Sequence, residues 1–397
     1  MMSPNVERRR YDSQIEPYIG NRNAKVLTGI RRSGKSTLLE MIAARMGDSV
    51  NIIILDMERW DNRPYRDPSS LYAKIKDSLT DGKSNCLFID EVQDIVEWES
   101  VIRSLISERC CDIYLTGSNS KLLSGEFATY LSGRLNVIEV FTLTLSECVE
   151  FERFRGGKAD PTEMLKRFLH SGGFPSVWCR DYNESHALRE ISDIVDAIVK
   201  KDISDRHSIR NTEMLDRILN NFTSINNVFE TLHAEDRSVV KTTVYDYVKY
   251  LEDAFLVVRV PVYDIKGRKH LTSKYKYYLS DIGIKNARLG FRPDDMPGYM
   301  ENIIYLELRS RGYRVSVGEV GGKEVDFIAE KDGRFIYVQA TTELSNEKVV
   351  NREFGNFDRI PDNHPKYVVT LEDGLLNADI DGVRCVKLTD FLMMQEY

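Results

Sequence analysis

The sequence of 397 residues has no apolar run long enough to cross a membrane. Its first ten residues are polar and basic without an apolar core, so we expect no secretory signal. The six cysteines show no C-x-x-C spacing and the six histidines are scattered, which argues against a disulfide framework and a zinc site. These absences predict a cytoplasmic protein with reduced cysteines and no membrane partner.

Basic residues are also fewer than acidic residues. The net charge is −7 and the isoelectric point is near 5.6, which argues against a protein that binds nucleic acid with its whole surface. The overall charge does not exclude local basic patches. The chain is longer than one ordinary domain, so we expect roughly two to four domains.

What the sequence does contain is a phosphate-binding motif. An apolar stretch at 25–28 runs into Gly29-Ile-Arg-Arg-Ser-Gly-Lys-Ser36, which has the G-x-x-x-x-G-K-[ST] spacing of a P-loop. Its glycines allow successive backbone N–H groups to face one anion, Lys35 supplies charge to the β- and γ-phosphates, and the Ser36 hydroxyl can bind Mg²⁺. Chance can produce a Gly-rich turn, but a strand before it and a helix after it favour a nucleotide site. The predicted nucleotide-binding residues are Gly29, Arg31, Arg32, Ser33, Gly34, Lys35, Ser36 and Thr37.

Apolar strands alternate with helices through the first third of the chain. This alternation predicts an α/β domain in which a parallel sheet is covered on both faces, with ligands at the carboxyl ends of the strands. We expect strands at 51–55, 86–89, 112–115 and 137–141, and helices at 69–79 and 98–106.

Polar residues follow two of these strands. Asp90 would hold Mg²⁺ and its water shell, and Glu91 would polarise the attacking water, although an acidic pair also suits a solvated strand end. Ser118 and Asn119 could orient that water, or simply form a turn or helix cap. Arg134, just before the last strand, could act as an arginine finger toward a neighbouring chain's γ-phosphate, or could be an ordinary surface arginine.

Taken in order, these motifs resemble those of the prokaryotic AAA+ ATPases. The likeness rests on the P-loop with its Arg31-Arg32 pair, the Phe88-Ile-Asp-Glu91 and Thr116-Gly-Ser-Asn119 segments, and, listed together, Leu131-Ser-Gly-Arg134, Leu143-Thr-Leu-Ser-Glu147, Gly172-Gly-Phe-Pro175 and Lys201-Asp-Ile203. The resemblance implies ATP and Mg²⁺ as cofactors, ATP hydrolysis, a homo-oligomer, and a helical lid, a winged-helix module and a degenerate nuclease-like end. It names no protein client.

The remaining chain is divided accordingly. We expect the P-loop AAA+ core at 1–141, a helical lid at 142–204, a winged-helix domain at 205–290 and a restriction-endonuclease-like α/β domain at 291–397. The two glycines of Gly172-Gly-Phe-Pro175 break the helical pattern and form a turn; contact with the adenine is the alternative that the resemblance adds. The predicted wing tip carries Lys266, Arg268, Lys269 and His270, which could bind DNA phosphates or form a solvated hairpin.

The last domain follows the PD-(D/E)xK nuclease pattern only in part. Asp326 on a strand and Glu301 on the preceding helix supply two carboxylates, and Glu324 falls on the same strand face as Asp326. The position for the next carboxylate is Gln339, and Thr341 stands where a lysine is needed. Because a catalytic Mg²⁺ needs carboxylate charge, we expect little or no nuclease activity.

Overall fold

In the computed structural model, the described residues are 6–119, 131, 133–207, 209, 213–220, 232–234, 237, 239–360, 362–372 and 379–397. The chain divides into two compact units. One comprises 1–142 with 253–255, and the other comprises 143–252 with 256–397. Among the described residues, no helix combines the length and the apolar character needed to cross a membrane.

The first unit contains a parallel sheet of five strands, which confirms the predicted α/β class. The strands are arranged in the order β2-β3-β4-β1-β5. Since β4 lies between β1 and β3, its carboxyl end lies between the P-loop that follows β1 and the acidic pair that follows β3. The strands are β1 (Ala24–Thr28), β2 (Val50–Asp56), β3 (Ser84–Asp90), β4 (Asp112–Gly117) and β5 (Leu135–Glu139).

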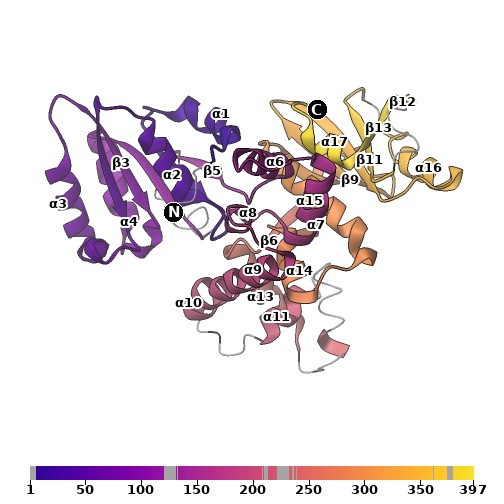
Figure 1. Ribbon diagram of the computed structural model, residues 1–397, viewed down its shortest axis with the longest axis horizontal. Helices are drawn as coiled ribbons and strands as arrows, with labels where there is room; N and C mark the ends of the chain where they lie inside the picture. Colours follow the sequence, from indigo (N-terminus) through magenta and orange to yellow (C-terminus); the bar gives the residue numbers. More distant parts are fainter. Residues whose placement is uncertain are drawn as a thin grey trace. The chain divides into compact units, whose positions relative to one another are not determined.

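Helices cover both faces of this sheet, because the strands are apolar on both sides (Figure 1). On one face, α2 (Lys35–Ala44) packs Leu38 and Ile42 against Phe88 of β3. On the other face, α3 and α4 pack against β1, β3 and β4. The remaining helical segments are η1 (Arg9–Tyr11), α1 (Asp12–Ile15), η2 (Glu16–Tyr18), η3 (Trp60–Arg66), α3 (Pro68–Ser78), η4 (Val92–Asp94) and α4 (Trp98–Glu108).

The second unit begins with the helices predicted at 142–204. A capping box at its first helix is made by Thr144 and Glu147. The helices are α6 (Leu145–Phe154), α7 (Pro161–Ser171), α8 (Pro175–Trp178), α9 (Glu184–Ile198), η6 (Val199–Ser204), α10 (Asp205–His207), α11 (Glu213–Asn220) and α13 (Lys241–Asp253). These helices belong to the unit that holds the C-terminal sheet, so closure over a nucleotide remains a prediction.

The two glycines at 172 and 173 form the predicted turn, and packing within the second unit explains both. A Cβ at Gly172 would lie 1.8 Å from Oδ1 of Asp281, and one at Gly173 would lie 2.0 Å from the carbonyl oxygen of Leu143. The Asp281 carboxylate accepts hydrogen bonds from the Gly173 N–H at 2.7 Å and the Gly283 N–H at 2.8 Å. It thereby joins the end of α7 to the start of α14 (Ile282–Leu289).

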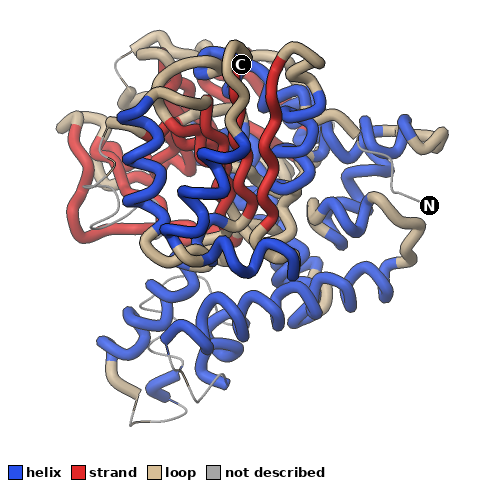
Figure 2. Tube along the Cα trace, turned by 90° about the vertical axis from the view of Figure 1, so that its left-hand side faces the viewer, coloured by secondary structure: helices blue, strands red, loops and turns tan. Residues whose placement is uncertain are grey.

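The C-terminal sheet has eight strands in the order β12-β13-β11-β10-β9-β8-β6-β7. The C-terminal end of the chain lies beside strands of this unit (Figure 2). There Tyr397 stacks on Phe391 at 4.4 Å, and both rings contact Tyr367. Its elements are β6 (Val257–Asp264), β7 (Lys269–Leu279), α14 (Ile282–Leu289), η7 (Pro293–Asp295), α15 (Met296–Ser310), β8 (Arg314–Val320), β9 (Lys323–Lys331), β10 (Arg334–Thr341), α16 (Glu347–Phe354), β11 (Lys366–Thr370), β12 (Asp379–Ile380), β13 (Val383–Lys387) and α17 (Leu388–Met393).

This topology corrects the expected division at 290. The hairpin β6–β7, predicted as the wing of a separate domain, extends the C-terminal sheet because β6 pairs in parallel with β8, with Val262 opposite Val317. The helix expected before the hairpin is present as α13. A sequence pattern for a helix and two strands cannot show which sheet those strands join.

Candidate nucleotide site

The loop between β1 and α2 has the backbone that a P-loop needs. Gly29 and Gly34 have φ values of 140° and 96°, which favour glycine. A Cβ at Gly29 would lie 2.3 Å from the carbonyl oxygen of Val140, so the loop passes the residue after β5 at a distance that excludes a side chain. Arg32 is also left-handed, with φ 69°.

Lys35 points back into the curve of this loop. Its buried ammonium donates to the carbonyl oxygens of Gly29 and Ile30, each at 3.0 Å. Among the described residues, the buried hydroxyl of Ser33 has no hydrogen-bond partner, and no side chain caps the start of α2. A preset ammonium, an unsatisfied buried hydroxyl and uncapped helix N–H groups together fit the phosphate chain of a nucleotide.

Asp90 and Ser36 come together across the site. Burial raises the pKa of Asp90 above its ordinary value, while hydrogen bonds from the hydroxyls of Thr116 and Ser36 oppose that shift. Thr116 donates directly to Oδ1 of Asp90. A carboxylate beside a serine hydroxyl is a ligand pair of the kind that Mg²⁺ prefers, and its role here stays a prediction.

Glu91 is buried beside them and is held by three groups. Its backbone N–H donates to the Thr116 hydroxyl at 2.9 Å, and its Oε2 accepts from Ser118 at 3.3 Å and from the side-chain amide of Gln93. The backbone of Glu91 is left-handed, with φ 55°. The structure thus brings Ser118 to Glu91 at the end of β4, with Asn119 buried next to it.

Arg8 is a part of the site that the sequence analysis missed. Its guanidinium is buried and donates to the carbonyl oxygens of Ser33 and Phe141 at 2.9 Å each, and to that of Thr142 at 3.3 Å. The Tyr11 hydroxyl accepts from the Phe141 N–H at 2.9 Å. The segment before β1 therefore ties the P-loop to the chain that follows β5, across more than a hundred residues of sequence.

The other predicted residues lie farther out. Arg31 pairs with Glu58 at 3.3 Å, and both Arg32 and Thr37 are exposed. Arg134 is exposed at the start of β5, where its carbonyl oxygen accepts from the Ala24 N–H. That contact places Arg134 at the amino-terminal edge of the sheet, where the strands begin, whereas the P-loop lies at the carboxyl ends of the strands. The two are roughly 15 Å apart along β1, at about 3.3 Å per residue. An arginine at that edge cannot reach the nucleotide site of its own chain.

A P-loop after β1, an acidic pair after β3 and, between these strands, a buried strand whose carboxyl end is polar define a P-loop ATPase of the AAA type. Residues 21–149 match the family model of an AAA domain, and residues 162–295 match a domain of unknown function, DUF8612. The Walker-type ATPase PABY2304 of Pyrococcus abyssi shares the fold, with a TM-score of 0.50 and 13% identity over 71% of this chain and 95% of that one.

Two relatives extend the likeness beyond the ATPase domain. An uncharacterized protein of Haemophilus influenzae is 30% identical over 400 residues, which cover 98% of each chain. One from Methanocaldococcus jannaschii is 30% identical over 84% of this chain and 78% of its own. The chain belongs to the family of the Haemophilus protein, and it is a prokaryotic AAA+ P-loop ATPase.

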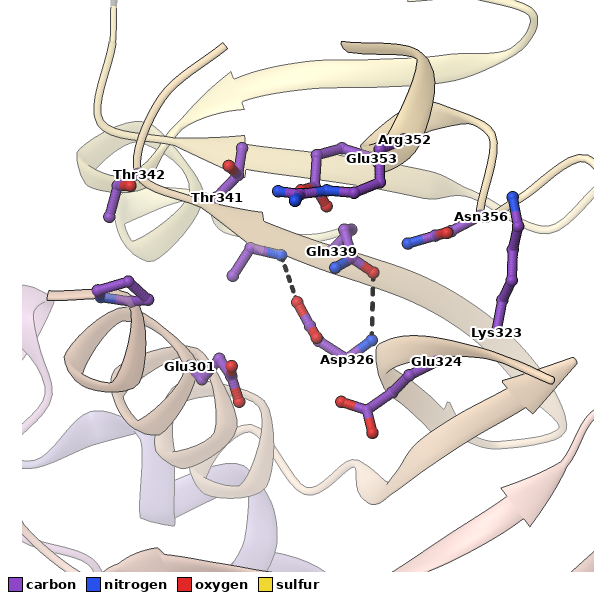
Figure 3. Close-up of a pocket in the computed structure, with 12 residues that line it drawn as sticks. Glu301, Lys323, Glu324, Asp326, Gln339, Thr341, Thr342, Arg352, Glu353 and Asn356 are labelled. Atoms are coloured by element: carbon purple, nitrogen blue, oxygen red, sulfur yellow. Dashed lines mark hydrogen bonds and ion pairs between the residues drawn. The ribbon is translucent and has the colours of Figure 1, made fainter. Parts of the chain in front are cut away.

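The predicted nuclease-like residues gather around one pocket of about 490 Å³ in the second unit (Figure 3). Glu301 reaches it from α15, Glu324 and Asp326 from β9, and Gln339 and Thr341 from β10. Gln339 accepts from the Asp326 N–H through Oε1 at 3.3 Å. The pocket also receives Arg352 and Glu353 from α16. Among the described residues, no group of His, Cys, Asp and Glu is arranged to hold a metal ion.

Proposed function

We propose that this protein is a Mg²⁺-dependent ATPase that works as a molecular switch or motor. The proposal rests chiefly on Glu91, a buried carboxylate beside Asp90 at the sheet edge that also carries the P-loop. Glu91 also contacts the polar end of β4 through the hydroxyl of Ser118.

Each residue of the proposed site has its own chemical role. Lys35 neutralises charge on the β- and γ-phosphates, and Ser36 with Asp90 would hold Mg²⁺, which supplies further neutralisation of the charge that develops on the phosphoryl group. Glu91 polarises the attacking water, with Ser118 and Asn119 positioning it. The side-chain amide of Gln93 and the hydroxyl of Ser118 both donate to Oε2 of Glu91 and hold the carboxylate in place.

The substitution Glu91→Gln tests this assignment. The variant should bind a fluorescent ATP analogue as the wild type does, while its turnover falls by about 10²-fold or more because the base is lost. Lys35→Ala should weaken binding itself. Glu97→Gln, a neighbouring exposed position, is the control and should keep full turnover. Wild-type turnover in Glu91→Gln would contradict the assigned role.

A DNA-binding effector whose nucleotide site only regulates assembly is the second candidate. It is favoured by the exposed basic turn of the β6–β7 hairpin, which carries Lys266, Arg268, Lys269 and His270. If these residues bind phosphates, DNA affinity falls steeply with salt, and neutralising the three Lys and Arg side chains flattens that slope. Steady ATP turnover that DNA leaves unchanged, with no DNA binding at low salt, favours the first candidate.

A further inference from the structure

A lysine that the nuclease pattern does not predict, Lys276, contacts two of the carboxylates that line the pocket of Figure 3. Lys276 lies on β7, in the hairpin that joins the outer side of the C-terminal sheet. Its Nζ is 2.6 Å from a carboxylate oxygen of Glu301 and 3.2 Å from one of Glu324. One ammonium therefore bridges carboxylates from α15 and β9, on the wall where Asp326 also lies.

Neighbouring groups fix this arrangement. The Tyr278 hydroxyl donates to Glu301 at 3.1 Å, and its ring stacks on Tyr305 at 4.8 Å. Asp326 accepts from the Ala340 N–H at 2.8 Å, which orients the carboxylate within the pocket (Figure 3). The ammonium of Lys276 therefore belongs to a cluster in which Glu301 and Asp326 are held by further hydrogen bonds, and its ion pairs are not incidental surface contacts.

We propose that Lys276 is a tethered counter-ion that occupies the position between Glu301 and Glu324 where a divalent cation would otherwise bind, and that it keeps this pocket free of metal. The distances from Nζ to the two oxygens are those of charge-assisted hydrogen bonds. The two carboxylate oxygens converge on Nζ, as ligands converge on a metal cation, but here the cation is a side chain of the protein.

Electrostatics supports the exclusion of metal. Burial by itself lowers the pKa of Lys276, but the charge of Glu301 and its hydrogen bond outweigh that effect and raise the pKa, so the ammonium keeps its proton. The pocket therefore has a resident cation between two of its carboxylates, and this charge opposes Mg²⁺ binding there.

The proposal is independent of ATP hydrolysis, and nucleotide-free protein tests it. Mn²⁺ is titrated against the full chain, and bound ion is counted by the loss of the free-ion electron paramagnetic resonance signal. Lys276→Met should bind one more Mn²⁺ per chain than the wild type, and its melting temperature, lowered by the loss of the counter-ion, should rise again with Mn²⁺. The double variant Lys276→Met with Glu301→Gln should lose the added ion.

Lys274→Met is the matched control, because it removes an exposed lysine of the same strand that pairs with Glu319 at 2.6 Å. It should bind no more Mn²⁺ than the wild type. Lys276→Gln repeats the test if the Met variant does not fold. A folded Lys276 variant that gains no Mn²⁺ overturns the proposal, as does wild-type binding that Glu301→Gln abolishes.

Discussion

At the residue scale, the groups that define the two sites are buried polar side chains with partners from distant parts of the chain. Arg8, Glu91 and Asp326 are each at least nine-tenths buried. Burying such groups costs free energy unless they are hydrogen-bonded, so their partners are informative about their roles. Each of these residues is held by groups from other elements, which makes it sensitive to single substitutions.

Arg8 braces the P-loop, and we expect Arg8→Ala to weaken nucleotide binding about tenfold. The substitution leaves the carbonyl oxygens of Ser33, Phe141 and Thr142 without their donor, and about 1–3 kcal/mol is typical for such a loss. The measurement is the Kd of a fluorescent ATP analogue beside the melting temperature. Arg8→Lys should recover part of the affinity.

The control for Arg8 is Arg9→Ala, because the Arg9 side chain is 81% exposed and pairs only with Glu7 among the contacts that the structure shows. It should bind the analogue as the wild type does. A lowered melting temperature in Arg8→Ala with unchanged Kd would reduce Arg8 to a purely structural role.

Asp326 should make the protein less stable as pH rises. Its pKa is raised to about 8 by burial and then by Glu301, whereas an unfolded aspartate ionises near 3.8. Between these values the folded chain binds a proton that the unfolded chain has lost, so the free energy of unfolding falls with increasing pH. Asp326→Asn removes this slope, which urea unfolding at several pH values between 5 and 8 would show.

A matched control for the pH experiment is Asp332→Asn, at an exposed left-handed turn position that asparagine tolerates. Its pH dependence should follow that of the wild type. If Asp326→Asn also keeps the wild-type slope, the buried carboxyl is not the source of the pH dependence.

At the scale of elements, one carboxylate connects two helices of the second unit. Asp281 caps α14 and accepts from the backbone after α7, while Asn286 of α14 donates to the carbonyl oxygens of Leu169 and His170 at 2.7 and 2.8 Å. The glycines at the end of α7 permit this approach. The pairing of α7 with α14 joins the helical region to the C-terminal sheet as one unit.

Gly172→Ala should therefore destabilise the second unit by roughly 2 kcal/mol more than Gly290→Ala. Both positions have positive φ, 62° and 73°, with extended ψ of −158° and 162°, a region essentially restricted to glycine, so both incur strain of about 1–3 kcal/mol for a Cβ there. Only Gly172 adds a clash, 1.8 Å from Asp281, whereas nothing lies within 4 Å of a Cβ at Gly290. Equal losses in urea unfolding would show that the contact with Asp281 relaxes freely.

At the scale of the whole molecule, the position of Arg134 sets a condition on its predicted role. It lies at the edge of the first unit's sheet opposite the P-loop, so a role in catalysis requires a second copy of the chain. A head-to-tail contact that places the Arg134 edge of one copy against the P-loop edge of the next is heterologous and leads to a ring or an open filament.

Arg134→Ala should accordingly reduce turnover about 10³-fold, which is the lower end of the rate effect of an arginine finger, and should leave the affinity for ATP unchanged. Mixing it with Lys35→Ala should restore part of the turnover, because one mixed interface then has both an intact P-loop and an intact arginine. The measurement is steady turnover across mixing ratios, beside native mass with and without ATP. An active monomer would rule out the finger.

The sequence by itself determined the local features of this protein. The P-loop, the strands around it, the acidic pair and the α/β class follow from short apolar runs and from glycines at fixed spacing, because each depends on neighbours in the chain. The sequence also predicted the partial nuclease pattern, including Gln339 and Thr341 at the positions where a carboxylate and a lysine are needed.

Only the tertiary structure decided which residues complete those sites. The β6–β7 hairpin joins the C-terminal sheet through pairing of β6 with β8, and this brings Lys276 to Glu301 and Glu324. Arg8 reaches Ser33 and Phe141 in a comparable way. Such contacts join residues that are far apart in sequence, and local periodicity carries no information on them. They arise because buried charges must find partners wherever the packing of the elements brings one within reach.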